Sequence, residues 1–77
     1  MPKAYVMINC DKGFGEETVK AMKRVKHVEA ADVVYGVYDI IAVVRAPTNA
    51  AMEDAIMNKI RKVKGVSSTL TMLVAKS

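Results

Sequence analysis

The sequence predicts an α+β fold whose elements follow one another as βαββαβ, and three patterns carry this prediction. The chain begins and ends with segments in which two sets of side chains alternate, which is the period of a β-strand. Two other segments carry apolar residues three or four positions apart, as amphipathic helices do. Between the two predicted helices lies a pair of short segments rich in β-branched residues, which indicates two more strands.

The first third of the chain is expected to form a strand and then a helix. Residues 3–10 form the strand, in which one alternate set consists of Ala4, Val6, Ile8 and Cys10. Residues 11–15 are rich in turn formers, and the acids Glu16 and Glu17 favour a helix start. We expect this helix over residues 15–26, with a buried edge made of Val19, Met22 and Val25.

The middle of the chain is expected to form a hairpin of two strands, residues 28–35 and 38–45. Only Gly36 and Val37 separate these strands, and a glycine is free to take a positive φ. This spacing predicts a two-residue turn. Pro47 ends the second of the two strands.

The last third is expected to form a helix and a final strand. Thr48 or Asn49 can cap a helix over residues 49–63, whose buried face consists of Met52, Ile56, Ile60 and Val63. Gly65 is a natural stop, and the last strand follows over residues 66–75. Its better core stripe is Leu70, Met72 and Val74, so the hydroxyls of Thr69 and Thr71 should point to the opposite face.

These elements close best as a four-stranded antiparallel sheet with both helices on one face, because each split βαβ crossover should be right-handed. This is the ferredoxin-like fold, formed here by a single domain over residues 1–77. The strand over residues 38–45 is apolar in both alternate sets, so a lone subunit would expose an apolar sheet face. The sequence therefore predicts a sheet-to-sheet homodimer.

Composition narrows the class of protein. The formal net charge is +4, but the basic residues gather toward the ends of the two predicted helices, where cations complement the helix dipole. Solvated helix ends are therefore favoured over a nucleic-acid surface. The single cysteine, Cys10, offers neither an intrachain disulfide nor a metal-ligand spacing, and no apolar stretch is long enough to cross a membrane. We expect a cytoplasmic protein without metal or cofactor.

Asp39 is the polar residue that stands out, because it lies directly before the most apolar stretch of the chain. Two roles are open to it. Its carboxylate could accept a backbone N–H at the hairpin, as aspartate often does in turns, or it could serve as a charged acceptor for a ligand at a subunit junction.

Two motifs carry a resemblance to a known family. The sequence Gly36-Val37-Tyr38-Asp39 is similar to the Gly-x-Tyr/Phe-Asp hairpin of the Lrp/AsnC ligand-binding domain, called RAM. The stretch from Gly65 to Thr71 is similar to that family's Gly-Val-x-x-Thr-x-Thr ending, and the resemblance covers nearly the whole chain. The family's regulators carry a helix-turn-helix domain before this one, whereas the first strand here begins close to Met1. The chain thus resembles a stand-alone RAM protein, with no direct DNA binding expected.

The resemblance implies dimers that assemble further, often as rings of four, with amino-acid effectors bound where dimers meet. A full-length Lrp/AsnC regulator is then a candidate partner. An amino acid needs a negative acceptor and several donors, which the sequence offers in Gly36, Tyr38, Asp39, Ser68, Thr69 and Thr71. Of these, Ser68 would face the helices unless the last strand has a bulge near its start.

Two other classes of protein share this element order. Some small ferredoxin-like dimers are isomerases or monooxygenases, but the only histidine, His27, has no evident catalytic partner, so we expect a protein that is not an enzyme. RNA-recognition motifs use aromatic side chains on their central strands, and the strand over residues 38–45 lacks that signature.

Overall fold

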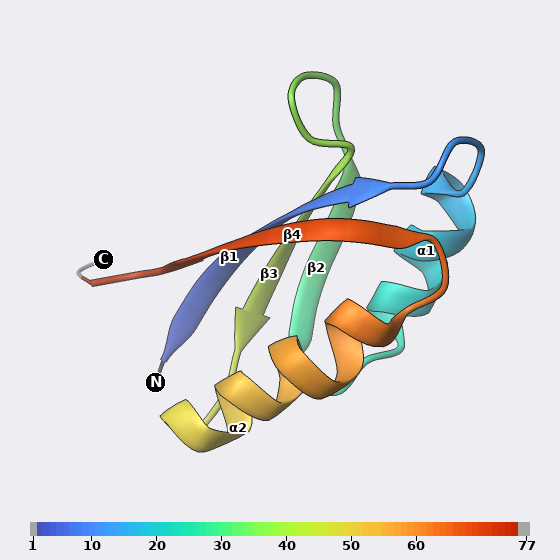
Figure 1. Cartoon of the computed structure of the whole chain (residues 1–77). Helices are drawn as coiled ribbons and strands as arrows, with labels where there is room; N and C mark the ends of the chain where they lie inside the picture. Colours follow the sequence, from blue (N-terminus) through green and yellow to red (C-terminus); the bar gives the residue numbers. More distant parts are fainter. Residues whose placement is uncertain (1, 76–77) are drawn as a thin grey trace.

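The computed structural model describes residues 2–75 and has the predicted order βαββαβ (Figure 1). Its strands are β1 (Lys3–Cys10), β2 (Val28–Val33), β3 (Ile40–Arg45) and β4 (Val66–Leu73). The first helix is α1 (Gly15–Lys23), and the second helical segment runs through α2 (Asn49–Asp54), a π-helical turn η1 (Ala55–Lys59) and a 3₁₀ turn η2 (Ile60–Lys62). The four strands form one antiparallel sheet in the order β2-β3-β1-β4. The ferredoxin-like fold is confirmed.

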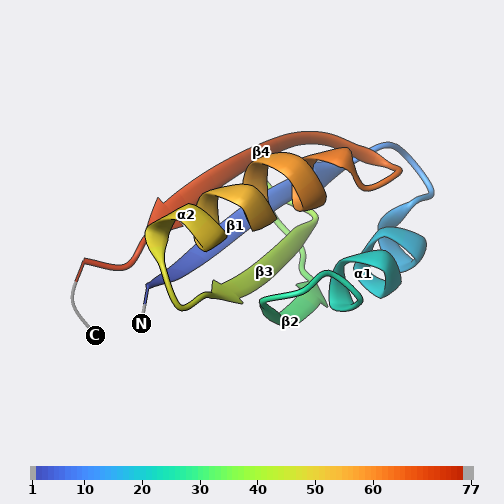
Figure 2. The same ribbon diagram turned by 90° about the horizontal axis from the view of Figure 1, so that it is seen from below.

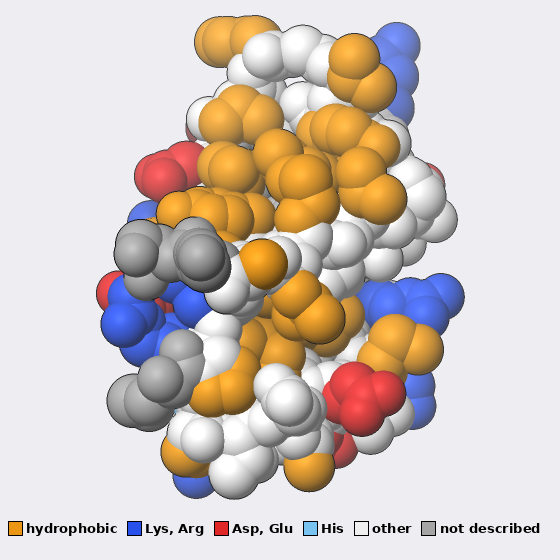
Figure 3. Space-filling view, turned by 90° about the vertical axis from the view of Figure 1, so that its left-hand side faces the viewer, with side chains coloured by type: hydrophobic (Ala, Val, Ile, Leu, Met, Phe, Trp, Pro, Cys, Tyr) orange, Lys and Arg blue, Asp and Glu red, His pale blue; other side chains and the backbone are white. Residues whose placement is uncertain are grey.

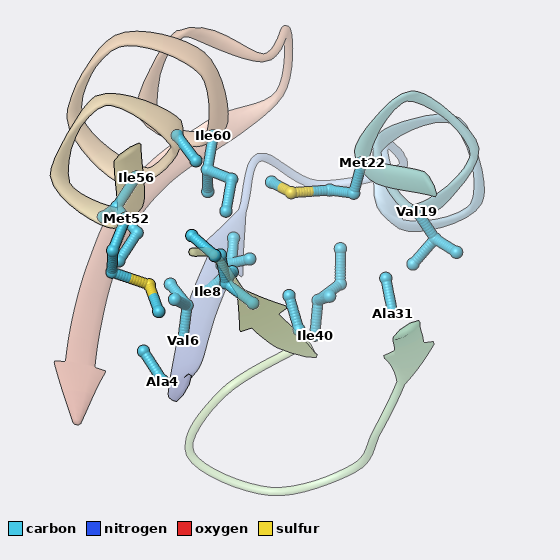
Figure 4. Close-up of a cluster of buried hydrophobic side chains, with 14 residues drawn as sticks. Ala4, Val6, Ile8, Val19, Met22, Ala31, Ile40, Met52, Ile56 and Ile60 are labelled. Atoms are coloured by element: carbon cyan, nitrogen blue, oxygen red, sulfur yellow. The ribbon is translucent and has the colours of Figure 1, made fainter. Parts of the chain in front are cut away.

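Both helices lie on one side of the sheet, and the core fills the space between the helices and the sheet (Figures 1 and 2). On β1, Ala4, Val6 and Ile8 are fully buried. Five of the seven predicted helix residues are buried, namely Val19, Met22, Met52, Ile56 and Ile60, whereas Val25 and Val63 are only partly buried because each lies just after its helix ends. Figure 4 shows Met22 of α1 extending toward Ile60 of the second helix above the strands. Each fully buried side chain of this size contributes about 1.5–3 kcal/mol, so this layer holds the helices on the sheet.

The second helix begins where the sequence predicted, at a threonine cap. The Thr48 Oγ1 atom accepts a hydrogen bond of 3.1 Å from the backbone N–H of Ala51. That bond satisfies one of the N–H groups that a helix start leaves without an intrahelical acceptor. No helix within residues 2–75 has the length and apolar character that crossing a membrane requires.

The two-residue hairpin is wrong, because β2 ends at Val33 and β3 starts at Ile40. The intervening loop, residues 34–39, is closed by a hydrogen bond of 2.8 Å from the Val34 N–H to the Asp39 carbonyl. At its other side the Asp39 N–H donates to the Ile8 carbonyl at 3.0 Å. Asp39 is therefore paired with β1, and the loop extends away from the sheet (Figure 1).

The predicted faces of the last strand are inverted. In the register with β1, Thr71 lies opposite Val6 and Thr69 opposite Ile8, and both β1 residues are fully buried under the helices. Opposite residues in an antiparallel pair share a face, so Thr69 and Thr71 lie on the helical side. Leu70 and Met72 lie on the other side and are 46% and 43% exposed. β4 is an edge strand at the rim of the core, where threonine hydroxyls remain near water. The alternation of apolar and polar residues in β4 therefore did not determine which set faces the helices.

The open side of the sheet is apolar. Its side chains on the two central strands are half-buried in the single chain: Tyr5, Met7, Ile41 and Val43. Leu70 and Met72 of β4 extend this surface, which we call the open face. Figure 3 shows hydrophobic side chains gathered on this side of the molecule.

We predict that Gly65→Ala destabilises the fold by about 2–4 kcal/mol, the sum of the cost of a left-handed backbone and of overpacking. Gly65 has a φ of +95°, and an added Cβ would lie 2.6 Å from Thr18 Oγ1 and 2.8 Å from Phe14 Cβ. Urea unfolding at fixed protein concentration measures the change. Gly15→Ala is the matched control, because no atom lies within 4 Å of its added Cβ. Equal stabilities of the two variants would contradict the packing argument.

Candidate functional site

A groove runs between the second helix and the edge strand β4. It consists of two adjoining cavities of about 470 and 510 Å³, which share Ile56, Met57 and Thr71. We call it the β4 groove. Its polar half is further lined by Arg61, Val66, Ser67, Ser68 and Thr69. Its apolar half is further lined by Asn49, Met52, Glu53 and Leu73.

A β-bulge shapes the polar half of the groove. Asn9 of β1 lies opposite Ser68 and Cys10 lies opposite Val66, which leaves Ser67 as the extra residue. The Ser67 hydroxyl donates to the Asn9 carbonyl at 2.9 Å, and the Asn9 side-chain amide donates to the Ser68 hydroxyl at 3.2 Å. Asn9 holds this bulge through two hydrogen bonds. Because the extra residue is Ser67, Ser68 keeps the alternation of the strand and lies on the face of Leu70 and Met72, not on the helical face that its own pattern predicted.

Arg61 brings a positive charge to the polar half. Its Nη1 lies 3.3 Å from the sulfur of Met57, which is a weak acceptor. Within residues 2–75 the only ion pair joins Arg45 and Glu29, at 2.9 Å, so the Arg61 guanidinium has no carboxylate partner there. Arg61 is one of the basic residues near the end of the second predicted helix, where the sequence predicted only a solvated charge. Its spacing of four from Met57 was the signal that both residues share one side of the helix.

The Asp39 carboxylate has a structural hydrogen bond of its own. Its Oδ2 atom accepts the Cys10 N–H at 2.8 Å, so the aspartate binds the end of β1 through both side chain and backbone. The carboxylate thus accepts a backbone N–H, as the first of its two expected roles required. The donor, however, belongs to the end of β1 and not to the hairpin. Around it, Gly36 has a φ of +145°, and the tip residues Tyr35 and Val37 are almost fully exposed.

The structure separates the six predicted site residues into two groups. Ser68, Thr69 and Thr71 line the β4 groove, whereas Gly36, Tyr38 and Asp39 line no part of it. Asp39 and Ser68 lie at the same end of the sheet, each beside the last residues of β1. β1 runs between them, so the two groups do not line one common groove within a single chain.

Cys10 lies between these groups, at the end of β1. Burial raises the pKa of its thiol, and the charges of Asp39 and Asp11 raise it further, while a hydrogen bond with Thr18 acts in the opposite direction. The thiol is therefore protonated at neutral pH, when it is a poor nucleophile. No three His, Cys, Asp or Glu side chains in the described part of the chain are grouped so that they could hold a metal ion.

We predict that Asp39→Ala destabilises the fold by about 1 kcal/mol, because the Cys10 N–H loses its acceptor. Asp39→Asn should cost less than half of this, since its amide oxygen can still accept the bond. Urea unfolding gives the free energy, and hydrogen exchange of the Cys10 amide gives a local readout. Faster exchange in Asp39→Ala but not in Asp39→Asn is the expected result. Unchanged exchange in both variants would show that the carboxylate does not hold this strand end.

Comparison with known proteins places this chain in a family. Residues 3–77 match the family model of the Lrp/AsnC ligand binding domain. No curated protein matches the sequence.

Solved structures similar to the chain include proteins of the same length and longer regulators. The crystal structure of TTHA0845 from Thermus thermophilus has 26% identity and a TM-score of 0.93, with 100% of this chain and 96% of that one covered. The hypothetical protein PHS023 from Pyrococcus horikoshii has 30% identity and a TM-score of 0.91, with coverage of 100% and 93%. The feast or famine regulatory protein Rv3291c from M. tuberculosis, complexed with L-methionine, has 22% identity and a TM-score of 0.81. This chain is covered completely in that comparison and spans 52% of the regulator.

Proposed function

The chain belongs to the Lrp/AsnC ligand-binding domain family, and from this premise we propose that it binds an amino-acid effector within an oligomer of its own copies. Binding then modulates Lrp/AsnC-type transcription regulation or amino-acid metabolism, with a full-length regulator of the family as a candidate partner. The observation that carries the proposal is the β4 groove, which combines several hydroxyls, an apolar half and a guanidinium that has no carboxylate partner among residues 2–75.

The groove suits one end of an amino acid. Arg61 and the hydroxyls of Thr69 and Thr71 provide donors for a carboxylate, and the Arg61 guanidinium is suited to a bidentate pair. Ile56 and Met57, which line both halves, provide apolar surface for a side chain. The Rv3291c structure contains L-methionine, so methionine is the first effector to test on this chain.

The ammonium group requires an acid from elsewhere. Glu53 lines the far half of the groove, but it is eight residues from Arg61, or about 12 Å along a helix. The carboxylate and ammonium of one amino acid are much closer together than that. Asp39 of a second subunit meets the requirement, because only the Cys10 N–H donates to its carboxylate within residues 2–75. Asp39 is exposed at the base of the loop, so its carboxylate can face a neighbouring groove while it keeps the bond from the Cys10 N–H.

The open face supports assembly. Tyr5, Met7, Ile41 and Val43 remain partly exposed beside Leu70 and Met72, and apolar patches of this extent usually mark an interface. We propose that a second copy covers this face, sheet to sheet, and that such dimers assemble further, as the rings of four dimers in the family do. An effector that bridges a groove and a neighbouring loop would favour one assembly over another.

This role is a binding role, not an enzymatic one. The titratable groups that line the β4 groove are Glu53 and Arg61, at opposite ends, and His27 does not line it. A carboxylate and a guanidinium placed so far apart do not act together as a general acid–base pair on one small substrate.

We predict that isothermal titration with L-methionine and the other proteinogenic amino acids detects saturable binding to the oligomer. Arg61→Gln and Asp39→Asn should each weaken the binding about tenfold or more, because each removes a charged hydrogen bond. Glu17→Gln, which removes an exposed charge at the start of α1, is the control and should leave the affinity unchanged. If no amino acid gives heat with the wild-type oligomer, the proposed effector class is wrong.

We further predict that Val43→Asp converts the dimer to a monomer, because it would bury an unpaired charge in the centre of the covered open face. Analytical ultracentrifugation measures the assembly. Val37→Asp changes an exposed loop residue in the same way and should leave the dimer intact. A wild-type protein that sediments as a monomer, or a Val43→Asp variant that still dimerises, would contradict the sheet-to-sheet arrangement.

A further inference from the structure

A second groove lies on the helical side of the molecule, remote from the open face. Its volume is about 490 Å³, and it runs between the turn after α1 and the middle of the second helix. We call it the helix groove. Small side chains, Ala51 and Ala55, leave room between the two elements. Because the sheet lies between this groove and the open face, a sheet-to-sheet dimer leaves it accessible.

Cations from two elements line the helix groove. Arg24 and Lys26 follow α1, and Lys59 comes from the π-helical turn of the second helix. All three are exposed, and none forms an ion pair within residues 2–75. The single acid in the lining is Asp54, whose Oδ1 accepts a hydrogen bond of 2.8 Å from the Asn58 amide. The lining therefore carries a formal excess of two positive charges.

The dipole of α1 accounts for cations near its own end. Lys59 lies in the last turn of the π-helical segment, so two different helical segments bring cations to the same groove. Charges of one sign that line a concave surface reinforce one another and raise the local concentration of an anion. The helix groove is therefore an anion-attracting surface built from two elements.

The backbone on both sides of the groove departs from regular geometry. His27 has a φ of +77°, within a turn closed by a hydrogen bond of 3.1 Å from the Val28 N–H to the Val25 carbonyl. That position favours glycine, so the half-buried histidine costs about 1–2 kcal/mol there. The opposite wall contains the π-helical turn, a rare feature that is frequent at functional sites. Both irregular segments line the helix groove beside its three cations.

We propose that the helix groove binds the phosphate group of a small phosphorylated ligand. Arg24 supplies a planar set of donors and Lys59 a point charge, and both kinds of side chain recognise phosphate in proteins. The volume lies within the usual range for small-molecule sites, about 300–1,000 Å³. It therefore leaves space over Ala51 and Ala55 for an organic group as large as a nucleoside. The proposal is independent of the amino-acid site.

The test is a backbone amide NMR titration of the full chain with inorganic pyrophosphate, and separately with AMP, at low salt. Saturable shifts should be confined to residues 24–28 and 51–59 for both probes. Arg24→Gln combined with Lys59→Gln should weaken binding about tenfold or more, because two charge-assisted contacts are lost. The control combines Lys12→Gln and Lys62→Gln, which removes the same charge outside the groove, and should change the affinity less than about twofold.

Three results would overturn the proposal. Equal weakening by the control pair would mean diffuse attraction by the net charge alone. Shifts that never saturate would mean that the groove holds no phosphate site. Binding of duplex DNA that pyrophosphate fails to displace would mean a nucleic-acid surface rather than a small-ligand site. Titration of the Arg24→Gln, Lys59→Gln protein with L-methionine keeps the two proposals apart, because effector binding should be unchanged.

Discussion

The arrangement of this molecule depends on how the end of β1 is held. Asp39 accepts the Cys10 N–H on one side of the strand, while Asn9 bonds Ser67 and Ser68 on the other. These contacts join β3, β1 and β4 at one end of the sheet. They set the position of the loop over residues 34–39 and the bulge in β4 together. A change at the end of β1 would therefore disturb both groups of proposed ligand-binding residues.

The same strand keeps those two groups apart. Asp39 lies on the β3 side of β1, whereas the β4 groove lies on the other side, and among residues 2–75 no acid lines the half of the groove that contains Arg61. A zwitterionic ligand needs both charges within a short distance. In the arrangement we propose, a site shared between subunits meets this requirement, and effector binding would then be coupled to assembly because each subunit supplies only part of the site.

The two faces of the molecule have different surfaces. The open face is apolar and suits another copy of the chain, whereas the helical side carries the unpaired cations of the helix groove. Because the sheet separates them, assembly through one face does not occupy the other. In the arrangement we propose, the sheet-to-sheet dimer would therefore present the helix groove of each subunit outward, where an anionic ligand can reach it.

Periodicity in the sequence determined the order of the elements, the helix faces around Met22 and Ile60, and the apolar character of both sides of β3. These features are local, since one side-chain period specifies each of them. The resemblance, not the periodicity, singled out the loop and the β4 residues as candidate ligand contacts. Only the tertiary structure decided the phase of β4, because an edge strand takes its faces from the register with β1. It also decided the length of the loop before β3, which the bonds of Asp39 to β1 impose, and the convergence of Lys59 with Arg24, which belong to different elements.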